Sequence, residues 1–210
     1  MMERSDAEKL IRDALAMYRE LRTYQDDGFV LVRGKGEEAL QRTTFRTHFV
    51  RPSSFRFEFS SPHPYPPLAH IVTKCICGLD GSTAYLSIKH HDDAARVQDY
   101  EDIVMAVAGA TGISHGSAYT IAQLLLDNFD EEPFELLDSA PDGDEVIEGS
   151  LCKLVRGKVP RAELDIALTI EPISLTIRKV MTTFPEFTSC EIRRDIRLNE
   201  AIAASLFSRP

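Results

Sequence analysis

The chain has 210 residues, of which 43% are hydrophobic, and its 33 acidic and 24 basic side chains give a formal net charge of −9. This length and apolar content provide for one sizeable hydrophobic core, so we expect a single domain over residues 1–210. The acidic balance argues against nucleic-acid or anionic membrane partners, and no run approaches the ~18 apolar residues of a transmembrane segment.

The first predicted element is an amphipathic helix over residues 5–22. Ser5 and Glu8 have the spacing of a capping box. Apolar side chains then recur at helical spacing on one side of the helix: Ala7, Leu10, Ile11, Ala14, Leu15, Tyr18 and Leu21. Such a helix packs on a sheet, and the β-prone run over residues 23–33 predicts the first strand.

Residues 45–59, FRTHFVRPSSFRFEF, carry the clearest alternation in the sequence. Pro52 cannot donate to a strand ladder, and Ser53 and Ser54 can bond locally, so we predict two strands joined by a short turn. Period-two spacing places the phenylalanines on the apolar face of their strands, which Arg51 shares: Phe45, Phe49, Phe55, Phe57 and Phe59. Such a face needs a large apolar partner, which is either the protein itself or a ligand.

Four prolines make residues 61–68 a stiff loop. Strand-like runs follow over residues 69–77 and 82–88, and five more occur later in the chain, over residues 134–139, 145–155, 162–170, 175–183 and 188–198. The turns between these runs are short, so neighbouring strands are expected to pair antiparallel.

Two central helices are predicted between these sets of strands. Asp99 and Asp102 cap the first, over residues 100–108, and the second runs from about residue 117 to residue 129. The second helix is apolar nearly all round, so it is either deeply buried or covers an opening lined by apolar groups. The elements together predict an α+β fold with one strongly curved antiparallel sheet, an N-terminal helix and two central helices.

No catalytic residue, metal site or cofactor is predicted. The glycine-containing segment between the central helices lacks the ending of a phosphate loop and is interpreted as a flexible turn. The CxC pair at residues 75–77 and the adjacent histidines at 90–91 do not suit a tetrahedral zinc site, and there is no GxSxG nucleophile elbow. His48 and His115 are interpreted as ordinary polar positions.

The remaining polar features have simple interpretations. Arg193, Arg194 and Arg197 are expected on a solvated strand face, and four cysteines are too few for a disulfide scaffold. The N-terminus lacks the charged start and apolar core of a secretory signal. We therefore expect a cytoplasmic protein if Met1 is the native start, and a periplasmic one if a signal has been removed.

The segment FVRPSSFRFE, residues 49–58, resembles the RP..FR(W/F) hairpin of the LolA/LolB-type lipoprotein-carrier superfamily, including its uncharacterised, outer-membrane lipoprotein-sorting-like branch. Residues 108–114, AGATGIS, followed by an apolar helix, resemble an insertion of that branch. Residues 198–207, LNEAIAASLF, resemble the end of the carriers. The resemblance implies that the sheet is an incomplete β-barrel whose concave side is covered by the two central helices, acting as a lid.

The resemblance also implies a function. The carriers are non-enzymatic binding proteins, so we expect this chain to bind an acyl chain, a lipid or a lipoprotein-like apolar ligand. The lid would capture the ligand when it closes and release it when it opens. A donor or acceptor protein would be a further partner. The ligand would lie between the five phenylalanines and Ile121, Leu124 and Leu125 of the lid. In the carriers the arginine that matches Arg51 bonds the lid-helix backbone, which implies a lid latch with acceptors within residues 109–117.

The sequence leaves alternatives open. The phenylalanine face can be filled by the protein's own side chains, which would make the chain an interaction or regulatory module without a ligand, and Arg51 can be a strand-end cation in water. An unrecognised hydrolase is a third possibility. The chain also departs from the carriers, because it shows no export signal and contains no tryptophan.

Overall fold

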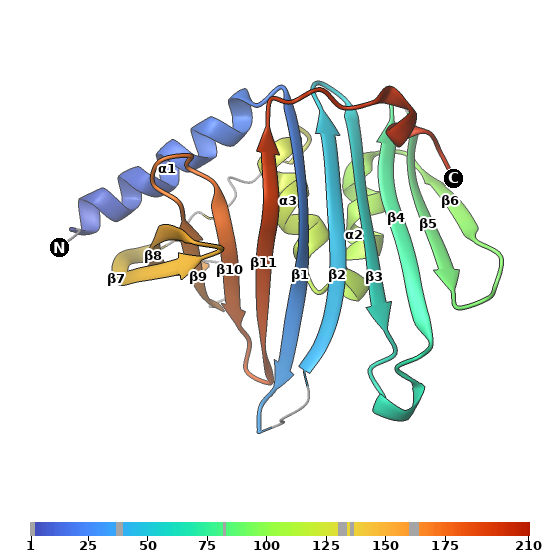
Figure 1. Cartoon of the computed structure of the whole chain (residues 1–210), viewed down its shortest axis with the longest axis horizontal. Helices are drawn as coiled ribbons and strands as arrows, with labels where there is room; N and C mark the ends of the chain where they lie inside the picture. The colour runs from blue at the N-terminus through green and yellow to red at the C-terminus, as the bar shows by residue number, and fades with distance from the viewer. Residues whose placement is uncertain (1–2, 37–39, 82, 130–133, 135–136, 160–163) are drawn as a thin grey trace.

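The computed structural model describes residues 3–36, 40–81, 83–129, 134, 137–159 and 164–210. Its strands form one antiparallel sheet in the order β6-β5-β4-β3-β2-β1-β11-β10-β9-β8-β7 (Figure 1). The first and last strands of the chain therefore pair with each other in the middle of the sheet. The strand bounds are β1 Thr23–Gly34, β2 Leu40–Val50, β3 Ser54–Pro62, β4 Val72–Asp80, β5 Thr83–His90, β6 Arg96–Tyr100, β7 Leu137–Ile147, β8 Ser150–Val159, β9 Leu164–Ile170, β10 Ile177–Thr183 and β11 Phe187–Leu198.

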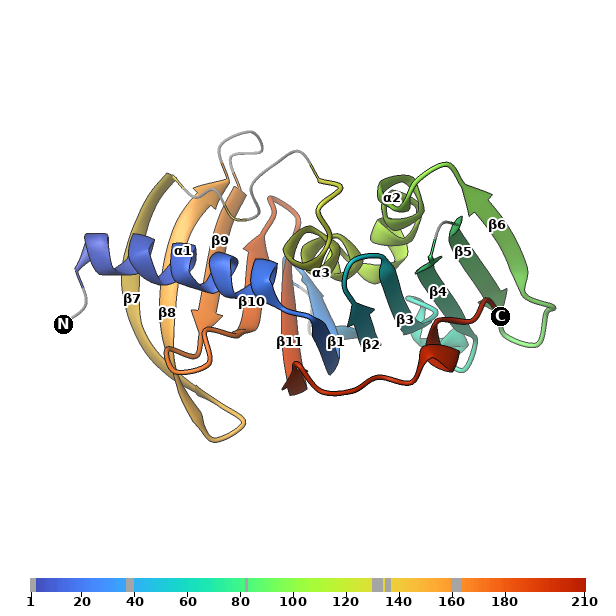
Figure 2. The same cartoon turned by 90° about the horizontal axis from the view of Figure 1, so that it is seen from above.

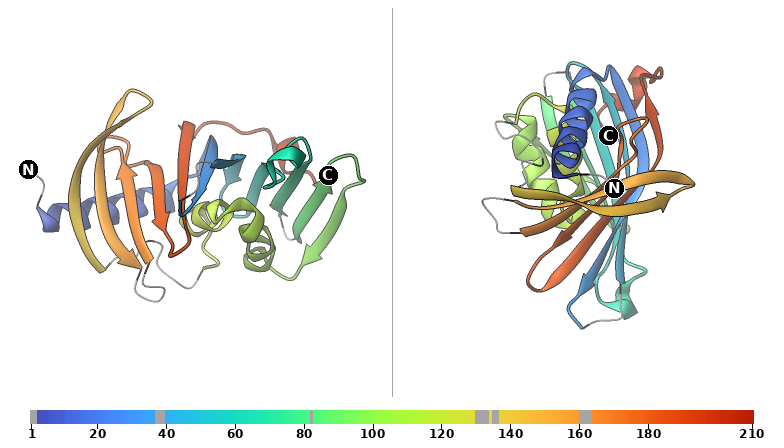
Figure 3. Two further views of the ribbon diagram at one scale, coloured as in Figure 1. Left: turned by 90° about the horizontal axis from the view of Figure 1, so that it is seen from below. Right: turned by 90° about the vertical axis from the view of Figure 1, so that its left-hand side faces the viewer.

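The helices lie together on the concave face of this sheet (Figure 2). They are α1 Arg4–Glu20, α2 Ile103–Ser114 and α3 Ser117–Leu125, with short 3-10 turns η1 Pro66–Leu68 and η2 Ala204–Phe207. α1 packs on β7 and β9, α2 packs on β3 to β6, and α3 lies between the other two helices. The sheet curves without closing, and β6 and β7 are its edges (Figure 3), so the predicted α+β half-barrel is confirmed.

α1 is amphipathic as predicted, because its apolar residues recur at helical spacing and its charged residues fall on the other side. The helix begins at Arg4, and the Asp6 carboxylate accepts a hydrogen bond from the backbone N–H of Glu3 at 3.0 Å. The predicted capping box of Ser5 and Glu8 is therefore wrong, since Ser5 already lies inside the first turn. The buried residues of the helix are Ala7, Ile11, Ala14, Leu15 and Tyr18.

The predicted phenylalanine hairpin is present. β2 and β3 pair Phe45 with Phe59 and Phe49 with Phe55. The rings of Phe45 and Phe57 stack with centroids 5.4 Å apart. Alternation placed these rings on one face because the side-chain period of a strand is two, and the apolar face is the one that the helices cover.

Two features of the strands differ from the sequence prediction. β7 runs through the predicted turn at Pro141, because β7 is an edge strand where proline costs no ladder bond and register shifts absorb the irregularity. The turn to β8 falls instead at Glu148 and Gly149, whose φ angles of 51° and 82° are typical of a tight two-residue hairpin. The edge strand β6 was not predicted, since its residues are mostly exposed and lack an apolar alternation.

The central helices differ in their bounds. α2 continues through Gly109, which lets the helix approach the sheet closely: a Cβ there would lie 3.1 Å from atoms of both Leu86 and Tyr100. The break between the helices falls at His115 and Gly116, with φ angles of 53° and 92°. α3 is also shorter than predicted, so the central helices make a compact pair over the sheet.

Candidate functional site

The concave face of the sheet and the helices above it share one apolar cluster. The five phenylalanines of β2 and β3 form part of its floor, and Ile121, Leu124 and Leu125 of α3 form part of its cover. Each of these residues is at most 4% exposed. The structure therefore brings the predicted ligand-binding residues together, and the protein's own side chains cover them.

Arg51 lies at the edge of this cluster, where the β2–β3 turn meets the ends of two helices. Its Nε donates to the Leu21 carbonyl at 3.0 Å, and one Nη donates to the Leu125 carbonyl at 3.2 Å. The other Nη lies 2.8 Å and 3.1 Å from the two carboxylate oxygens of Asp127. One guanidinium thus joins the hairpin to the chain after α1 and to the last turn of α3.

The acceptors of Arg51 are not those that the resemblance implied. They lie at Leu21, Leu125 and Asp127 rather than within residues 109–117. The reason is that the two groups lie at opposite ends of the long central strands. Arg51 follows the end of β2 that pairs with Thr23, whereas the turn between α2 and α3 lies near Ser189, at the other end of β1.

A charged network is buried in the floor of the same cluster. Arg193 of β11 is 0% exposed and points at the helices, where one Nη donates to Asp26 Oδ2 at 2.5 Å and the other to Glu191. The Tyr24 hydroxyl donates to the same Asp26 oxygen at 2.7 Å. The expectation that Arg193 is solvated is therefore wrong: consecutive residues of a strand face opposite ways, so Arg194 reaches the outer face while Arg193 lies inside. Arg197 is exposed, as expected.

The network reaches the helices and perturbs its members. Burial raises the pKa of the Glu191 carboxyl, although Arg193 and a hydrogen bond with Thr120 of α3 oppose the rise. Burial also lowers the pKa of Arg193, but the carboxylates beside it outweigh this effect and hold its pKa well above the ordinary value. Arg193 therefore stays charged inside an otherwise apolar interior. Two residues before Glu191, the Ser189 hydroxyl donates to the His115 carbonyl at 3.4 Å.

Some polar atoms of this interior have no hydrogen-bond partner among the described residues. They are Asp26 Oδ1, Thr47 Oγ1 and Arg193 Nε. Period-two alternation with Phe45 and Phe49 puts Thr47 on the phenylalanine face, but sequence reasoning missed Asp26 and Arg193. Their spacing is the signal that could have found them. Asp26 lies two residues from Tyr24 and Arg193 lies two residues from Glu191, so each pair shares the inner face of its strand.

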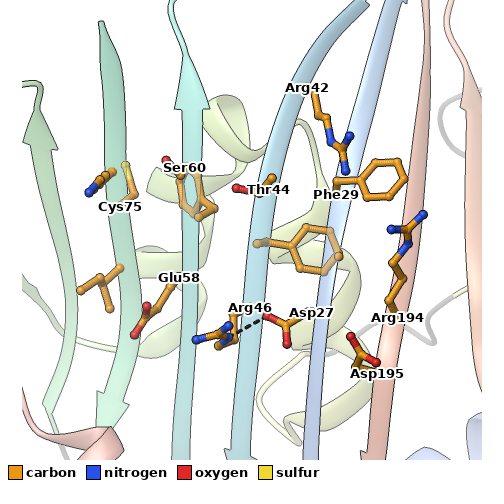
Figure 4. Close-up of a pocket in the computed structure, with 15 residues that line it drawn as sticks. Asp27, Phe29, Arg42, Thr44, Arg46, Glu58, Ser60, Cys75, Arg194 and Asp195 are labelled. Atoms are coloured by element: carbon orange, nitrogen blue, oxygen red, sulfur yellow. Dashed lines mark hydrogen bonds and ion pairs between the residues drawn. The ribbon is translucent and has the colours of Figure 1, made fainter. Parts of the chain in front are cut away.

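A separate hollow of about 680 Å³ lies on the face of the sheet opposite the helices (Figure 4). Phe29 lies in it, with the guanidinium carbons of Arg42 and Arg194 at 4.1 Å and 4.7 Å from the ring centroid. Arg46 and Asp27 form an ion pair at 2.7 Å across its floor. The hollow spans β11 and β1 to β4.

The outer hollow is lined by charged side chains together with apolar residues such as Phe29 and Ile76. Arg46 is paired with Asp27, and Arg194 Nε lies 3.0 Å from Glu148 Oε1. Much of the positive charge of the hollow is therefore neutralised by carboxylates of the protein itself. The charged side chains of this lining can bind polar or charged groups. Sequence reasoning missed the hollow because its residues come from five strands and each one alternates with a buried neighbour, so each resembles an ordinary solvated position.

Cysteines and metal ligands contribute little to either site. Cys75, Cys77, Cys152 and Cys190 are free, and burial raises the pKa of Cys75 and of Cys77 to about 12, which leaves these thiols unreactive. Within the described parts of the chain, no group of three or more histidine, cysteine, aspartate or glutamate side chains could hold a metal ion. None of the described helices has the length and apolar character needed to cross a membrane.

Similarity to known proteins exists at the level of structure. No family model matches the sequence, and no curated protein matches it. The Mycobacterium tuberculosis lipoprotein LppX superimposes with a TM-score of 0.55 at 14% identity, over 95% of this chain and 98% of LppX. LprF from Mycobacterium bovis gives 0.55 at 11% identity, over 97% and 98%. A LolA superfamily protein from Nitrosomonas europaea gives 0.42 at 8% identity, over 97% of each chain.

These likenesses concern the fold alone. They extend over nearly the whole of both chains, although few residues are identical. The LolA-like fold that the hairpin motif of β2 and β3 predicts is therefore confirmed.

Proposed function

We propose that this chain is a non-enzymatic binding protein for an apolar ligand, such as an acyl chain, a lipid or a lipoprotein-like group. The ligand lies between the phenylalanine face and α3. The observation that carries the proposal is the continuity of the apolar surface over β2 and β3, which is covered by two short helices rather than by a second sheet. Five phenylalanines bury roughly 150–250 Å² each, which is a large surface to assign to so small a cover.

Two other findings support this function. The fold is shared with LppX, which is named a lipoprotein, and with LprF. The β2–β3 hairpin carries the sequence motif that resembles the lipoprotein carriers. A partner protein that donates or accepts the ligand fits the same proposal.

Arg51 is proposed as the latch of the lid. Its hydrogen bonds to the Leu21 and Leu125 carbonyls involve a charged donor and are worth about 1.5–3 kcal/mol each at most. The Asp127 side chain is 74% exposed, so its ion pair with Arg51 contributes only about 0.2–1 kcal/mol. An acyl chain that buries about 200 Å² gains about 5 kcal/mol. The free energy gained by burying the ligand is therefore comparable to that of the Arg51 contacts. Ligand binding can thus compensate for breaking these contacts when the lid opens.

The test is native mass spectrometry of the protein before and after incubation with stearic acid and, separately, with a phosphatidylcholine of defined chains. We expect a discrete adduct of ligand mass that leaves on organic extraction. An Ile121→Glu substitution places a charge against the bound chain and should abolish the adduct. Met105→Glu is the matched control, because Met105 is 55% exposed on α2, and it should bind as the wild type does.

A bare polypeptide mass under all these conditions, from protein whose fold is verified by circular dichroism, would reject the proposal. Equal binding by the Ile121→Glu variant would reject the site. Circular dichroism of each variant shows whether a lost adduct reflects a lost fold.

A second function follows if the interior never opens. The phenylalanines are fully covered in this arrangement, and the outer hollow around Phe29 offers a separate polar surface. The protein would then be an interaction or regulatory module with a self-filled core. Light scattering of the purified chain tests for self-association, and a dimer that Arg42→Glu dissociates would favour this alternative.

A further inference from the structure

Three of the buried polar residues lie side by side on the inner face of the sheet. Asp26 of β1 is paired directly with Thr47 of β2. On the other side of β1, Arg193 of β11 is paired with Gly28, two residues from Asp26 and on the same face. All three side chains are at most 1% exposed, beneath the central helices.

The bonding of this group is incomplete. Asp26 Oδ2 accepts from Tyr24 and Arg193, and the two Nη atoms of Arg193 donate to carboxylates. Asp26 Oδ1, Thr47 Oγ1 and Arg193 Nε have no partner among the described residues. A buried polar atom left without a partner destabilises the fold, and such atoms are few in folded proteins. Here one acceptor, one hydroxyl and one donor lie on adjacent strands.

The three atoms lie where the proposed ligand passes. Thr47 stands between Phe45 and Phe49 on β2 and opposite Phe57 on β3. The Arg193 guanidinium carbon is 5.1 Å from the centre of the Phe45 ring. A chain lying along the phenylalanine face therefore crosses this polar group, and a pure hydrocarbon at that point would leave all three atoms without partners.

The balance of charge identifies the ligand group. Asp26 and Glu191 set two carboxyl groups against one guanidinium, so a further carboxylate or phosphate would be repelled. A hydroxyl group fits, because its O–H can donate to Asp26 Oδ1 while its oxygen, which has two lone pairs, accepts from both Thr47 and Arg193 Nε.

We propose that the interior recognises a hydroxyl group borne on the ligand chain, through Asp26, Thr47 and Arg193, so that the ligand is a hydroxylated acyl chain or lipid. This inference rests on the proposed function, since it assigns the ligand class of the same interior.

The experiment compares ligands that differ by one hydroxyl. Stearic acid is titrated against the 3-, 10- and 12-hydroxystearic acids by competition in native mass spectrometry. We expect at least one hydroxylated acid to bind about three- to tenfold more tightly than stearic acid, which is the worth of one net hydrogen bond. The plain chain would otherwise be favoured, because its binding leaves no hydroxyl to be desolvated.

Thr47→Val is the informative variant, since valine keeps the shape of threonine and removes the hydroxyl. Because that hydroxyl has no partner in the described chain, the variant should melt at or above the wild-type temperature. It should bind stearic acid as the wild type does and lose the preference for the hydroxylated acid. Thr47→Ser retains a hydroxyl and should keep the preference.

Thr43→Val is the matched control. Thr43 lies on the same strand and face, but its hydroxyl is bonded to Ser61 at 2.9 Å, so the preference should survive its loss. Equal binding of stearic and hydroxystearic acids by the wild type would overturn this inference while leaving the proposed function intact, as would an undiminished preference in Thr47→Val. Binding of neither acid, by folded protein, would overturn both.

Discussion

Arg51 and Asp127 face each other across the junction of the β2–β3 turn with the end of α3, with a guanidinium nitrogen 2.8 Å from a carboxylate oxygen. The Arg51 side chain is 23% exposed and that of Asp127 is 74% exposed. The arginine is thus a mostly buried group at the edge of the apolar cluster, and its partner Asp127 is exposed to solvent. Its carbonyl partners, at Leu21 and Leu125, are the stronger part of the junction.

Arg51→Leu should therefore loosen the central helices much more than Asp127→Asn. We expect the leucine variant to lower the stability of the closed lid by about 2–4 kcal/mol, because two carbonyls lose a charged donor. The asparagine variant should cost at most about 1 kcal/mol. Hydrogen exchange of residues 103–125 measures both effects. Unchanged protection in Arg51→Leu would show that the arginine does not hold the lid.

Two glycines should respond to alanine in opposite directions. A Cβ at Gly28 of β1 would lie 2.3 Å from a Phe45 ring carbon and 2.5 Å from the Ile192 carbonyl oxygen, whereas a Cβ at Gly112 of α2 meets nothing within 4 Å. Gly28→Ala should destabilise by about 1–3 kcal/mol through overpacking. Gly112→Ala should stabilise by about 0.5–1 kcal/mol through helix propensity. Urea unfolding of the two variants checks this; a stable Gly28→Ala protein would mean that both the Phe45 ring and the Ile192 backbone shift to make room for the methyl group.

The lid should weaken in mild acid because of His115. Its Nε2 is buried without a partner among the described residues, and burial lowers the pKa of this imidazole from its ordinary 6.5. In the lid that we propose, the His115 imidazole is neutral above pH 6.5 in both the closed and the open form. Below pH 6.5 the imidazole takes up a proton in the open form but not in the closed form. The stability of the closed form therefore falls until the pH reaches the lowered pKa.

The measurement is hydrogen exchange of α2 and α3 between pH 7.5 and pH 5, corrected for intrinsic rates. His115→Asn tolerates the positive φ angle of this position and should flatten the pH dependence. Burial also lowers the pKa of His48 on β2. His48→Gln is therefore the control, because it removes another histidine whose pKa is lowered by burial and should leave the lid response in place. A lid whose pH response survives His115→Asn would exclude this mechanism.

The turn between β9 and β10 should lose stability only in stronger acid. Glu171 Oε2 accepts from the Ser174 hydroxyl at 2.6 Å and from Arg178 at 2.8 Å, and these bonds lower the pKa of Glu171 to about 2. Because the folded-state pKa is depressed, the stabilisation is present above pH 4.5 and is lost as the pH falls toward 2.

Glu171→Gln should thus be less stable than the wild type at pH 7, and the difference should shrink below pH 4.5. Thermal melts from pH 7 to pH 2 follow this convergence. Glu186→Gln, on the exposed turn between β10 and β11, should show no such effect. A constant difference across the pH range would mean that the Glu171 carboxylate is not what stabilises the turn.

The sequence predicted the parts of this fold that depend on local periodicity. The Phe45 to Phe59 hairpin and α1 followed from apolar side chains at period two and at helical spacing. The course of β7 through Pro141 did not follow, because a proline is excluded from central strands but not from edges, and only the assembled sheet shows which strand is an edge.

The interior charges were missed for a different reason. Whether Arg193 faces solvent or the core depends on a one-residue phase of β11, and the run Arg193, Arg194 and Arg197 carries no apolar alternation that would fix it. The acceptors of Arg51 were misplaced because they depend on where α3 ends relative to the sheet. The outer hollow around Phe29 arises from five strands, so no single segment indicates it.

The pairing of β1 with β11 at the centre of the sheet has a consequence for how the protein is made. A ribosome delivers β1 at the start of synthesis and β11 at the end, so the two halves of the sheet remain separate until the last strand emerges. The aromatic hairpin is complete long before then, and its apolar face meets water or a chaperone while it waits. The pairing of β1 with β11 joins residues from opposite ends of the chain, and such long-range contacts form slowly during folding. A chain whose synthesis stops before β11 would therefore expose the apolar surface that the helices cover in the folded protein.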